Sequence, residues 1–295
     1  MKRYLFIIAA TLLLACDKAP KSTDSNTLYV SILPLKYIAG EIVGQDFDIR
    51  VLVPAGASPE TFEPTPKQFV DLNKARMIFN VGLIDFEKAL LAKIEDRSKV
   101  INLSQGIDLI EGSCSHVGNS REEPHRPDTL QHTHAHGVDP HVWTSPGALQ
   151  RMAANAYEAI HAAWPDSVKY TENYRRLTEK LQQLDRRTRE KINRSNLRYF
   201  IIYHPALTYY ARDYGIRQVA IESDGKEPSA KRLAELIRMA RKDGIHDIFY
   251  QNQFPASVVE TIARDINART VAIDPLREDV IENIDSITDL ITNTR

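Results

Sequence analysis

The feature that most constrains the fold is a stretch from Ser167 to Arg194 that contains neither glycine nor proline. Asp166 precedes it and is suited to cap a helix. Apolar residues recur along it at helical spacing, at Tyr170, Tyr174, Leu177, Leu181, Leu184 and Ile192. At 1.5 Å per residue the helix is roughly 40 Å long. Its apolar stripe is narrow and its other faces are charged, so we predict a helix that lies across two lobes.

Strand and helix patterns alternate on both sides of this stretch. Strands are predicted at residues 27–33, 48–53, 77–81 and 99–103 before it, and at 198–203, 217–221, 247–250 and 270–273 after it. Further helices are predicted to open at Pro34, Pro66 and Pro146, and to span 229–242, 255–267 and 280–292. Strands separated by helical patterns imply parallel sheets covered on both faces. We therefore predict an α/β fold with two parallel-sheet lobes.

The N-terminal residues predict export and lipid attachment. A positively charged start precedes an apolar run from Tyr4 to Ala15 that is too short to span a bilayer. The run ends in Leu-Leu-Ala-Cys16, which resembles a bacterial lipobox with Cys16 as the acylated first residue. An ordinary signal peptide with an incidental cysteine is the alternative. We expect a signal peptide at 1–15, a polar tether at 16–26, and a membrane-anchored lipoprotein of the cell envelope that faces the periplasm or the exterior.

The charge and cysteine content exclude several classes of protein. The chain has 38 basic and 39 acidic residues, so it has no strong positive field and nucleic acid is not an expected partner. With Cys16 lipidated, Cys114 is the one remaining cysteine and an intramolecular disulfide is not possible. Roughly 270 residues follow the tether, enough for the chain to bury its own core, and we expect a monomer.

Histidines are concentrated in one polar segment. Five of the nine lie in the loop predicted at residues 111–137, at His116, His125, His132, His134 and His136. The segment has no hydrophobic periodicity, which is typical of a loop. Tracts rich in histidine are typical of metal binding. We interpret these side chains as an auxiliary zinc-collecting loop of low affinity, and a merely solvated insertion is the alternative.

Metal-capable side chains also follow several predicted strands. Glu60 and Glu63 lie in the loop after the second strand, His204 and Asp274 directly follow two later strands, and His141 precedes the helix that opens at residue 146. Ligands of parallel α/β sheets bind beyond the carboxyl ends of the strands. We therefore expect these residues to converge in one cleft between the lobes. Two imidazoles and two carboxylates are a reasonable ligand set for a divalent ion.

Each of these residues has a structural alternative. A histidine after a strand is often hydrogen-bonded without binding a metal, an Asp-Pro pair starts turns, and a glutamate in a loop rich in Pro and Gly is usually solvated. An enzymatic alternative is a metallohydrolase with Glu60 or Glu63 as general base. The chain has no His-Glu-x-x-His helix and no nucleophile elbow, so we expect a binding protein and no enzyme.

A set of motifs now points to a family. They are Ser31-Ile-Leu-Pro34, the stretch from Val53 to Thr65, Asp139-Pro-His141-Val-Trp143, His204, Glu222 and Asp274-Pro275-Leu276. With the lipobox and the His-rich loop, the chain resembles the zinc- and manganese-binding solute-binding proteins of ABC transporters, the ZnuA/TroA-like cluster A-I group. The resemblance covers nearly everything from Thr27 to Thr292. It implies two α/β lobes joined by a long rigid helix, with the metal held between them.

The resemblance also implies a function and a division of the chain. The protein would capture a divalent transition metal, zinc by preference and manganese or ferrous iron as alternatives, and deliver it to an ABC transporter permease with its ATPase. Glu60, His141, His204 and Asp274 would bind the metal, with Glu63 and Glu222 supporting them. The lobes would span 27–143 and 198–295, with a helical connection at 144–197. A metal-dependent surface adhesin that shares the fold is an alternative.

One position departs from the family pattern. Glu60 stands where the family usually has histidine. Either Glu60 binds the metal directly, or a water molecule or a histidine of the auxiliary loop takes that position. The two histidines and two carboxylates are the ligand types of the family's manganese binders, but those proteins usually have Glu at the position of His204. Carboxylates suit harder ions, whereas His204 and the His-rich loop favour zinc. Because imidazoles bind metals only when deprotonated, we expect the affinity to fall as the pH drops through roughly 6.5.

Overall fold

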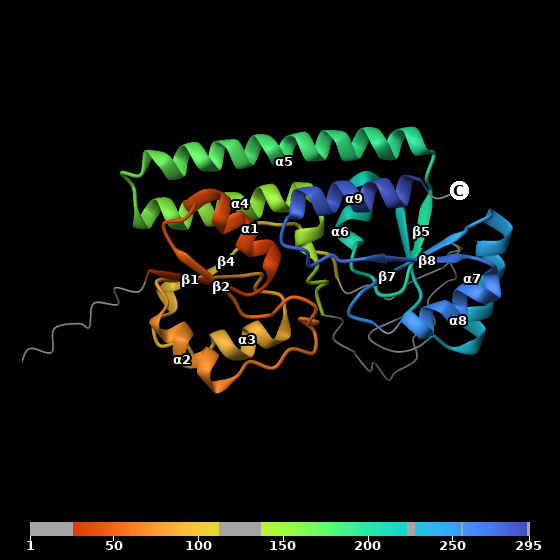
Figure 1. The fold of residues 1–295 in the computed structure, drawn as a ribbon, viewed down its shortest axis with the longest axis horizontal. Helices are drawn as coiled ribbons and strands as arrows, with labels where there is room; N and C mark the ends of the chain where they lie inside the picture. Colours follow the sequence, from red (N-terminus) through yellow and green to blue (C-terminus); the bar gives the residue numbers. More distant parts are fainter. Residues whose placement is uncertain (1–25, 112–136, 223–227, 255, 294–295) are drawn as a thin grey trace, which may run out of the picture.

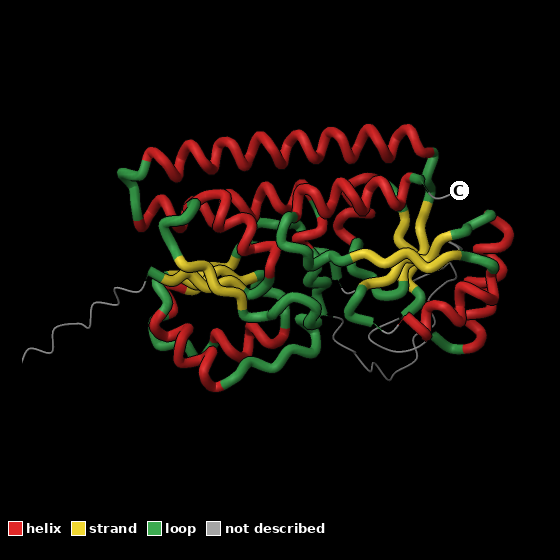
Figure 2. The backbone as a smooth tube through the Cα atoms, in the orientation of Figure 1, coloured by secondary structure: helices red, strands yellow, loops and turns green. Residues whose placement is uncertain are grey.

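The protein is built from two parallel sheets that lie end to end beneath one long helix (Figures 1 and 2). The structure, a computed structural model, describes residues 26–111, 137–222, 228–254 and 256–293. Cys16 and the five histidines of the auxiliary loop lie outside the described residues. Within the described part of the chain, no helix is long and apolar enough to cross a membrane.

The two sheets have the same strand order. The first runs β2-β1-β3-β4 and the second β6-β5-β7-β8, with every described pairing parallel. The strands are β1 (Thr27–Val30), β2 (Asp48–Val51), β3 (Met77–Asn80), β4 (Val100–Asn102), β5 (Tyr199–Ile202), β6 (Arg217–Ala220), β7 (Asp247–Gln251) and β8 (Arg269–Ile273). Every predicted strand is present, although several end earlier than predicted. The α/β prediction with two parallel-sheet lobes is confirmed.

Helices cover both faces of each sheet (Figure 1). The described helices are α1 (Leu33–Val43), α2 (Pro66–Lys74), α3 (Asp85–Leu91), α4 (Pro146–Ala163), α5 (Val168–Ser195), α6 (Thr208–Tyr214), α7 (Ala230–Asp243), α8 (Ala256–Ile266) and α9 (Val280–Thr292), with short 3-10 turns η1 (Arg97–Lys99) and η2 (Val142–Thr144). Helices α1, α4, α6 and α9 lie on the α5 side of the sheets, whereas α2 and α3 cover the opposite face of the first sheet and α7 and α8 that of the second.

Local sequence signals set the helix starts. Thr65 accepts a hydrogen bond from the backbone N–H of Gln68, whose side chain accepts the Thr65 N–H in return, which forms a capping box. The predicted cap of the long helix is wrong by one residue. Ser167 caps it by accepting from the N–H of Tyr170, while the carbonyl of Asp166 accepts from Val168 in the preceding turn.

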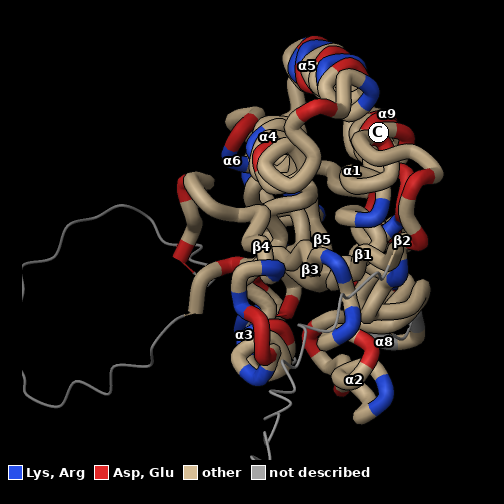
Figure 3. Tube along the Cα trace, turned by 90° about the vertical axis from the view of Figure 1, so that its left-hand side faces the viewer, with Lys and Arg blue, Asp and Glu red and all other residues tan. Residues whose placement is uncertain are grey.

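Helix α5 links the two lobes, as predicted. Its 28 residues extend about 42 Å. Leu177, Leu181 and Leu184 are fully buried in a hydrophobic core that also contains Leu28 of β1 and Ile202 of β5, so one continuous core reaches both sheets. The helix packs against α1 and α9. Acidic and basic residues are interleaved along it (Figure 3).

Ion pairs attach α5 to both neighbours. Lys180 pairs with Glu41 of α1 at 2.6 Å, and Lys191 pairs with Asp285 of α9 at 2.8 Å. Exposed pairs of this kind contribute little stability each. The buried leucines therefore provide most of the attachment of α5.

Helix α6 was not predicted from the sequence. This helix has seven residues, three of them tyrosines, and is too short to show a clear helical periodicity. It begins four residues after His204 and packs against α4 and η2, so it joins two segments that carry predicted metal ligands.

Candidate metal centre

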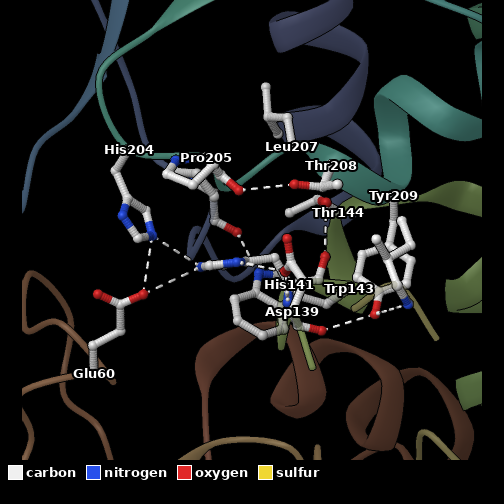
Figure 4. A network of polar contacts seen from close by, with 12 residues as sticks. Glu60, Asp139, His141, Trp143, Thr144, His204, Pro205, Leu207, Thr208 and Tyr209 are labelled. Atoms are coloured by element: carbon white, nitrogen blue, oxygen red, sulfur yellow. Dashed lines mark hydrogen bonds and ion pairs between the residues drawn. The ribbon is translucent and has the colours of Figure 1, made fainter. Parts of the chain in front are cut away.

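Three predicted ligands, Glu60, His141 and His204, point toward one another (Figure 4). The Nε2 atom of His204 lies 3.0 Å from a carboxylate oxygen of Glu60 and 3.3 Å from the Nε2 atom of His141. The third side of the triangle, from His141 Nε2 to the same Glu60 oxygen, is 3.8 Å. Among the described residues, these three side chains form a group that could hold a metal ion.

The size of the triangle fits a zinc ion. Zinc bonds of about 2.0–2.1 Å at tetrahedral angles separate neighbouring donor atoms by roughly 3.3 Å. The three observed separations lie on both sides of this value. An ion could therefore bind all three side chains after adjustments of a few tenths of an ångström.

His204 lies just beyond the end of β5 and is held firmly. It is 8% exposed, its ring stacks on Phe254, and its carbonyl accepts a hydrogen bond from the side chain of Gln251. The Nδ1 atom contacts the buried carboxylate of Glu222 at 2.8 Å. Burial alone would lower the pKa of His204, but the hydrogen bonds and charges of Glu222 and Glu60 outweigh it and raise the pKa to about 9.

His141 lies at the start of η2 and is held in a similar way. It is 7% exposed, and its Nδ1 atom and its backbone N–H both lie 2.9 Å from one carboxylate oxygen of Asp139. Burial would raise the pKa of Asp139, but the hydrogen bond and charge of His141 hold it below its usual value. Nearby, Trp143 donates to the carbonyl of Pro275 and ties η2 to the loop after β8.

Glu60 comes from the loop between β2 and α2. Its backbone N–H donates to Ser58, and its side chain is 38% exposed. Burial would raise the pKa of Glu60, but the hydrogen bond from His204 and the charges of both imidazoles lower it. A carboxylate that is ionised and partly open to solvent is suited to bind an incoming cation.

Asp274 does not join the three converging donors. One of its carboxylate oxygens accepts hydrogen bonds from the side chain of Gln253 at 3.2 Å and from the backbone N–H of Leu276 at 3.0 Å. The carbonyl of Asp274 accepts from Asn283 of α9. The loop after β8 nevertheless reaches the site, because Pro275 and Leu276 line the same small cavity as Glu60.

The two predicted supporting glutamates differ. Glu222 contacts a ligand directly, whereas Glu63 is exposed and, among the described contacts, forms no hydrogen bond or ion pair with either imidazole. The role of Asp139 was not predicted from the sequence. Its signal was the position two residues before His141, from which a short acidic side chain can reach back to the imidazole.

The site separates two cavities. One, of about 30 Å³, is enclosed by residues that include Trp143, Phe254 and Leu276. The other is a wider hollow of about 370 Å³ that Glu60, Lys88 and Glu222 help to line. An ion could reach the three donors from the wider side, whereas the smaller cavity is mostly apolar.

Comparison with known proteins identifies the family. The model of the zinc-uptake complex component A family, described as periplasmic and named ZnuA, matches residues 28–294. The chain belongs to this family. The high-affinity zinc uptake system protein ZnuA of Bacillus subtilis is 32% identical over 286 residues, which cover 92% of this chain and 88% of that protein.

Two further ZnuA-like proteins agree with this assignment. The zinc-binding lipoprotein AdcA of Streptococcus pneumoniae is 27% identical over 94% of the chain, which spans 56% of the length of AdcA. The crystal structure of a zinc-bound deletion mutant of ZnuA superposes with a TM-score of 0.79 at 30% identity, covering 92% of this chain and 98% of that one. The resemblance predicted from the sequence is confirmed.

Proposed function

We propose that this protein captures zinc outside the cytoplasm and delivers it to the permease of an ABC transporter that works with an ATPase. The observation that carries the proposal is the convergence of Glu60, His141 and His204, whose donor atoms lie 3.0–3.8 Å apart, on both sides of the roughly 3.3 Å of a tetrahedral zinc site. Membership of the zinc-uptake family supports the transport role. Nothing in the proposal requires catalysis, and the relatives above are named as zinc-uptake or zinc-binding proteins.

In this proposal the two imidazoles and Glu60 bind the ion directly. Asp274 is the fourth ligand, and it would have to exchange its contact with Gln253 for the metal. Glu222 and Asp139 hold the Nδ1 sides of the imidazoles, which leaves the Nε2 lone pairs for the ion. Glu63 is exposed, and a supporting role for it rests on the family resemblance alone.

Zinc is the preferred cargo because the compact triangle contains two nitrogen donors. Manganese prefers more oxygen ligands and a larger coordination number. Glu60, which replaces a histidine usual in the family, adds oxygen character. Manganese and ferrous iron therefore remain alternatives that direct competition can test.

Several further parts of the proposal rest on sequence alone. The histidines of residues 111–137 would form weaker auxiliary sites, and the lipid on Cys16 would anchor a monomer to the membrane. Mass spectrometry of the N-terminal peptide would detect the lipid, and a Cys16→Ser variant should release the protein from the membrane. A protein that stays anchored in that variant would contradict the lipid assignment.

Release of the ion is proposed to involve small movements. One hydrophobic core joins both lobes through α5, so a wide opening would expose much apolar surface. Shifts of the Glu60 loop and the loop after β8 would remove ligands without breaking that core.

Titration of metal-free protein with zinc tests the proposal. We expect one tight site per chain and additional weaker sites. Removal of residues 112–136 should abolish the weaker sites and leave the tight one. Absence of a tight site in the intact protein would contradict the proposed function, and loss of it in the deletion variant would contradict the ligand assignment.

A further inference from the structure

The two ends of the segment that carries the auxiliary histidines are paired with each other. Glu111 and Val138 form an antiparallel bridge, and the backbone N–H of Asp139 donates to the carbonyl of Ile110 at 2.9 Å. This pairing leads directly into His141. The position of that ligand therefore depends on what holds the paired backbone in place.

Tyr209 of α6 contacts both of the paired backbone segments. Its side chain is fully buried, and its hydroxyl accepts a hydrogen bond from the backbone N–H of Ile110 at 3.1 Å and donates one to the carbonyl of Asp139 at 2.8 Å (Figure 4). Burial raises the pKa of Tyr209, so the hydroxyl keeps the proton that it donates. Arg212, one helical turn later, lies over the Tyr209 ring and donates to the carbonyl of Asp108.

The contacts of Tyr209 continue to the metal site through Asp139. The carbonyl of Asp139 is fixed by Tyr209, and its carboxylate accepts from both the backbone N–H and the Nδ1 side of His141. Tyr209 itself lies five residues after His204, on the helix that follows that ligand. One side chain thus connects the segment of one imidazole to the segment of the other.

We propose that Tyr209 is a positioning residue that sets the place of His141 relative to His204. The inference rests on the proposed function, because it concerns the affinity of the same metal site. The hydroxyl acts through Asp139 and has no contact with the ion. Loss of the hydroxyl allows the Asp139 backbone to move, so that the Nε2 atoms of His141 and His204 no longer have the spacing that a metal ion requires.

A buried tyrosine could also serve stability alone, and the next residue provides the control. Tyr210 is equally buried in the same helix, and its hydroxyl pairs with Thr288 of α9 at 2.9 Å. Among the described contacts, it has none with the three converging ligands. Tyr209→Phe and Tyr210→Phe therefore remove matched hydroxyl groups, only one of which leads to the site.

The test compares zinc affinity, by competition with a chelating indicator, with thermal unfolding of the metal-free protein. Both variants should lower the melting temperature by a few degrees. Only Tyr209→Phe should weaken zinc binding, by about threefold to tenfold, and alter the cobalt(II) absorption spectrum. If the wild type binds zinc tightly and Tyr209→Phe leaves the affinity unchanged, the inference about Tyr209 is overturned and the proposed function is not.

A double-mutant cycle with Asp139→Ala tests the route. If Tyr209 acts through Asp139, Tyr209→Phe should weaken zinc binding much less in the Asp139→Ala background than in the wild type. If Tyr209→Phe weakens zinc binding equally in the wild type and in the Asp139→Ala background, the inference is overturned. This holds whether or not Tyr209→Phe also lowers the melting temperature. A wild-type protein without a tight zinc site would overturn the proposed function and this inference together.

Discussion

The Nε2 atoms of His141 and His204 lie 3.3 Å apart although 63 positions separate the two residues. Each imidazole is held from its Nδ1 side by a buried carboxylate, Asp139 for His141 and Glu222 for His204. A hydrogen bond at Nδ1 orients the ring and directs the Nε2 lone pair at a metal. The two rings are therefore oriented for an ion before one binds.

Replacement of either histidine should abolish tight binding. His141→Ala and His204→Ala each remove one nitrogen donor, and we expect the zinc affinity to fall by more than roughly 100-fold. His161→Ala is a suitable control because His161 is exposed on α4 and belongs to no described metal-ligand group. Calorimetric titration measures the effect. Retained tight binding in either ligand variant would exclude that histidine from the site.

Zinc binding should release a proton from His204. Because its pKa is raised to about 9, the metal-free imidazole is protonated at pH 7.5 and zinc must displace that proton. The zinc affinity should therefore increase as the pH rises to about 9 and should decrease as the pH falls below that value. For an ordinary imidazole the decrease would begin only near pH 6.5.

Calorimetry in buffers of different ionisation enthalpy measures that proton. We expect about one proton per zinc at pH 7.5 and fewer for Glu222→Gln, which removes a charge that raises the His204 pKa. A heat of binding that does not depend on the buffer would contradict the protonated state of His204.

Glu60 should set the choice of metal. Glu60→His restores the residue that the family usually has and replaces an oxygen donor with nitrogen. We expect the preference for zinc over manganese to increase by roughly tenfold or more. Glu63→His on the same loop is the control, since Glu63 is exposed. An unchanged preference in Glu60→His, measured by competition between the two metals, would show that Glu60 is not a ligand.

The core that joins the lobes should depend on α5. Leu181 is fully buried there, and Leu181→Ala should lower the free energy of unfolding by about 2–5 kcal/mol. Gln182→Ala, at an exposed position next to it, should change this free energy by less than about 0.5 kcal/mol. Denaturant unfolding of the metal-free protein compares them. Similar losses for both variants would argue against α5 as the shared support.

Much of the fold follows from local patterns. The strand runs, the prolines in the first turns of α1, α2 and α4, and the long stretch without Gly or Pro each identify an element from its own residues. Helix α6 was not predicted because its seven residues, three of them tyrosines, show no clear helical periodicity of apolar residues. The predicted cap of α5 was wrong by one residue because Asp166 and Ser167 are both good capping residues, and only the geometry of the turn decides between them.

The site was predictable in part. His204 and His141 follow from their positions at strand and helix ends. The contacts of Asp139 and Tyr209 join segments that the sequence does not show to be adjacent, and the Gln253 contact of Asp274 depends on the packing of two loops. Pairings of this kind come from tertiary structure and have no local signature.

Anomalous diffraction at the zinc edge from a crystal of the zinc-loaded protein tests the central claim most directly. We predict one strong peak about 2.0–2.2 Å from the Nε2 atoms of His141 and His204 and from a carboxylate oxygen of Glu60. A strong peak elsewhere, with these three side chains unbound, would contradict the account.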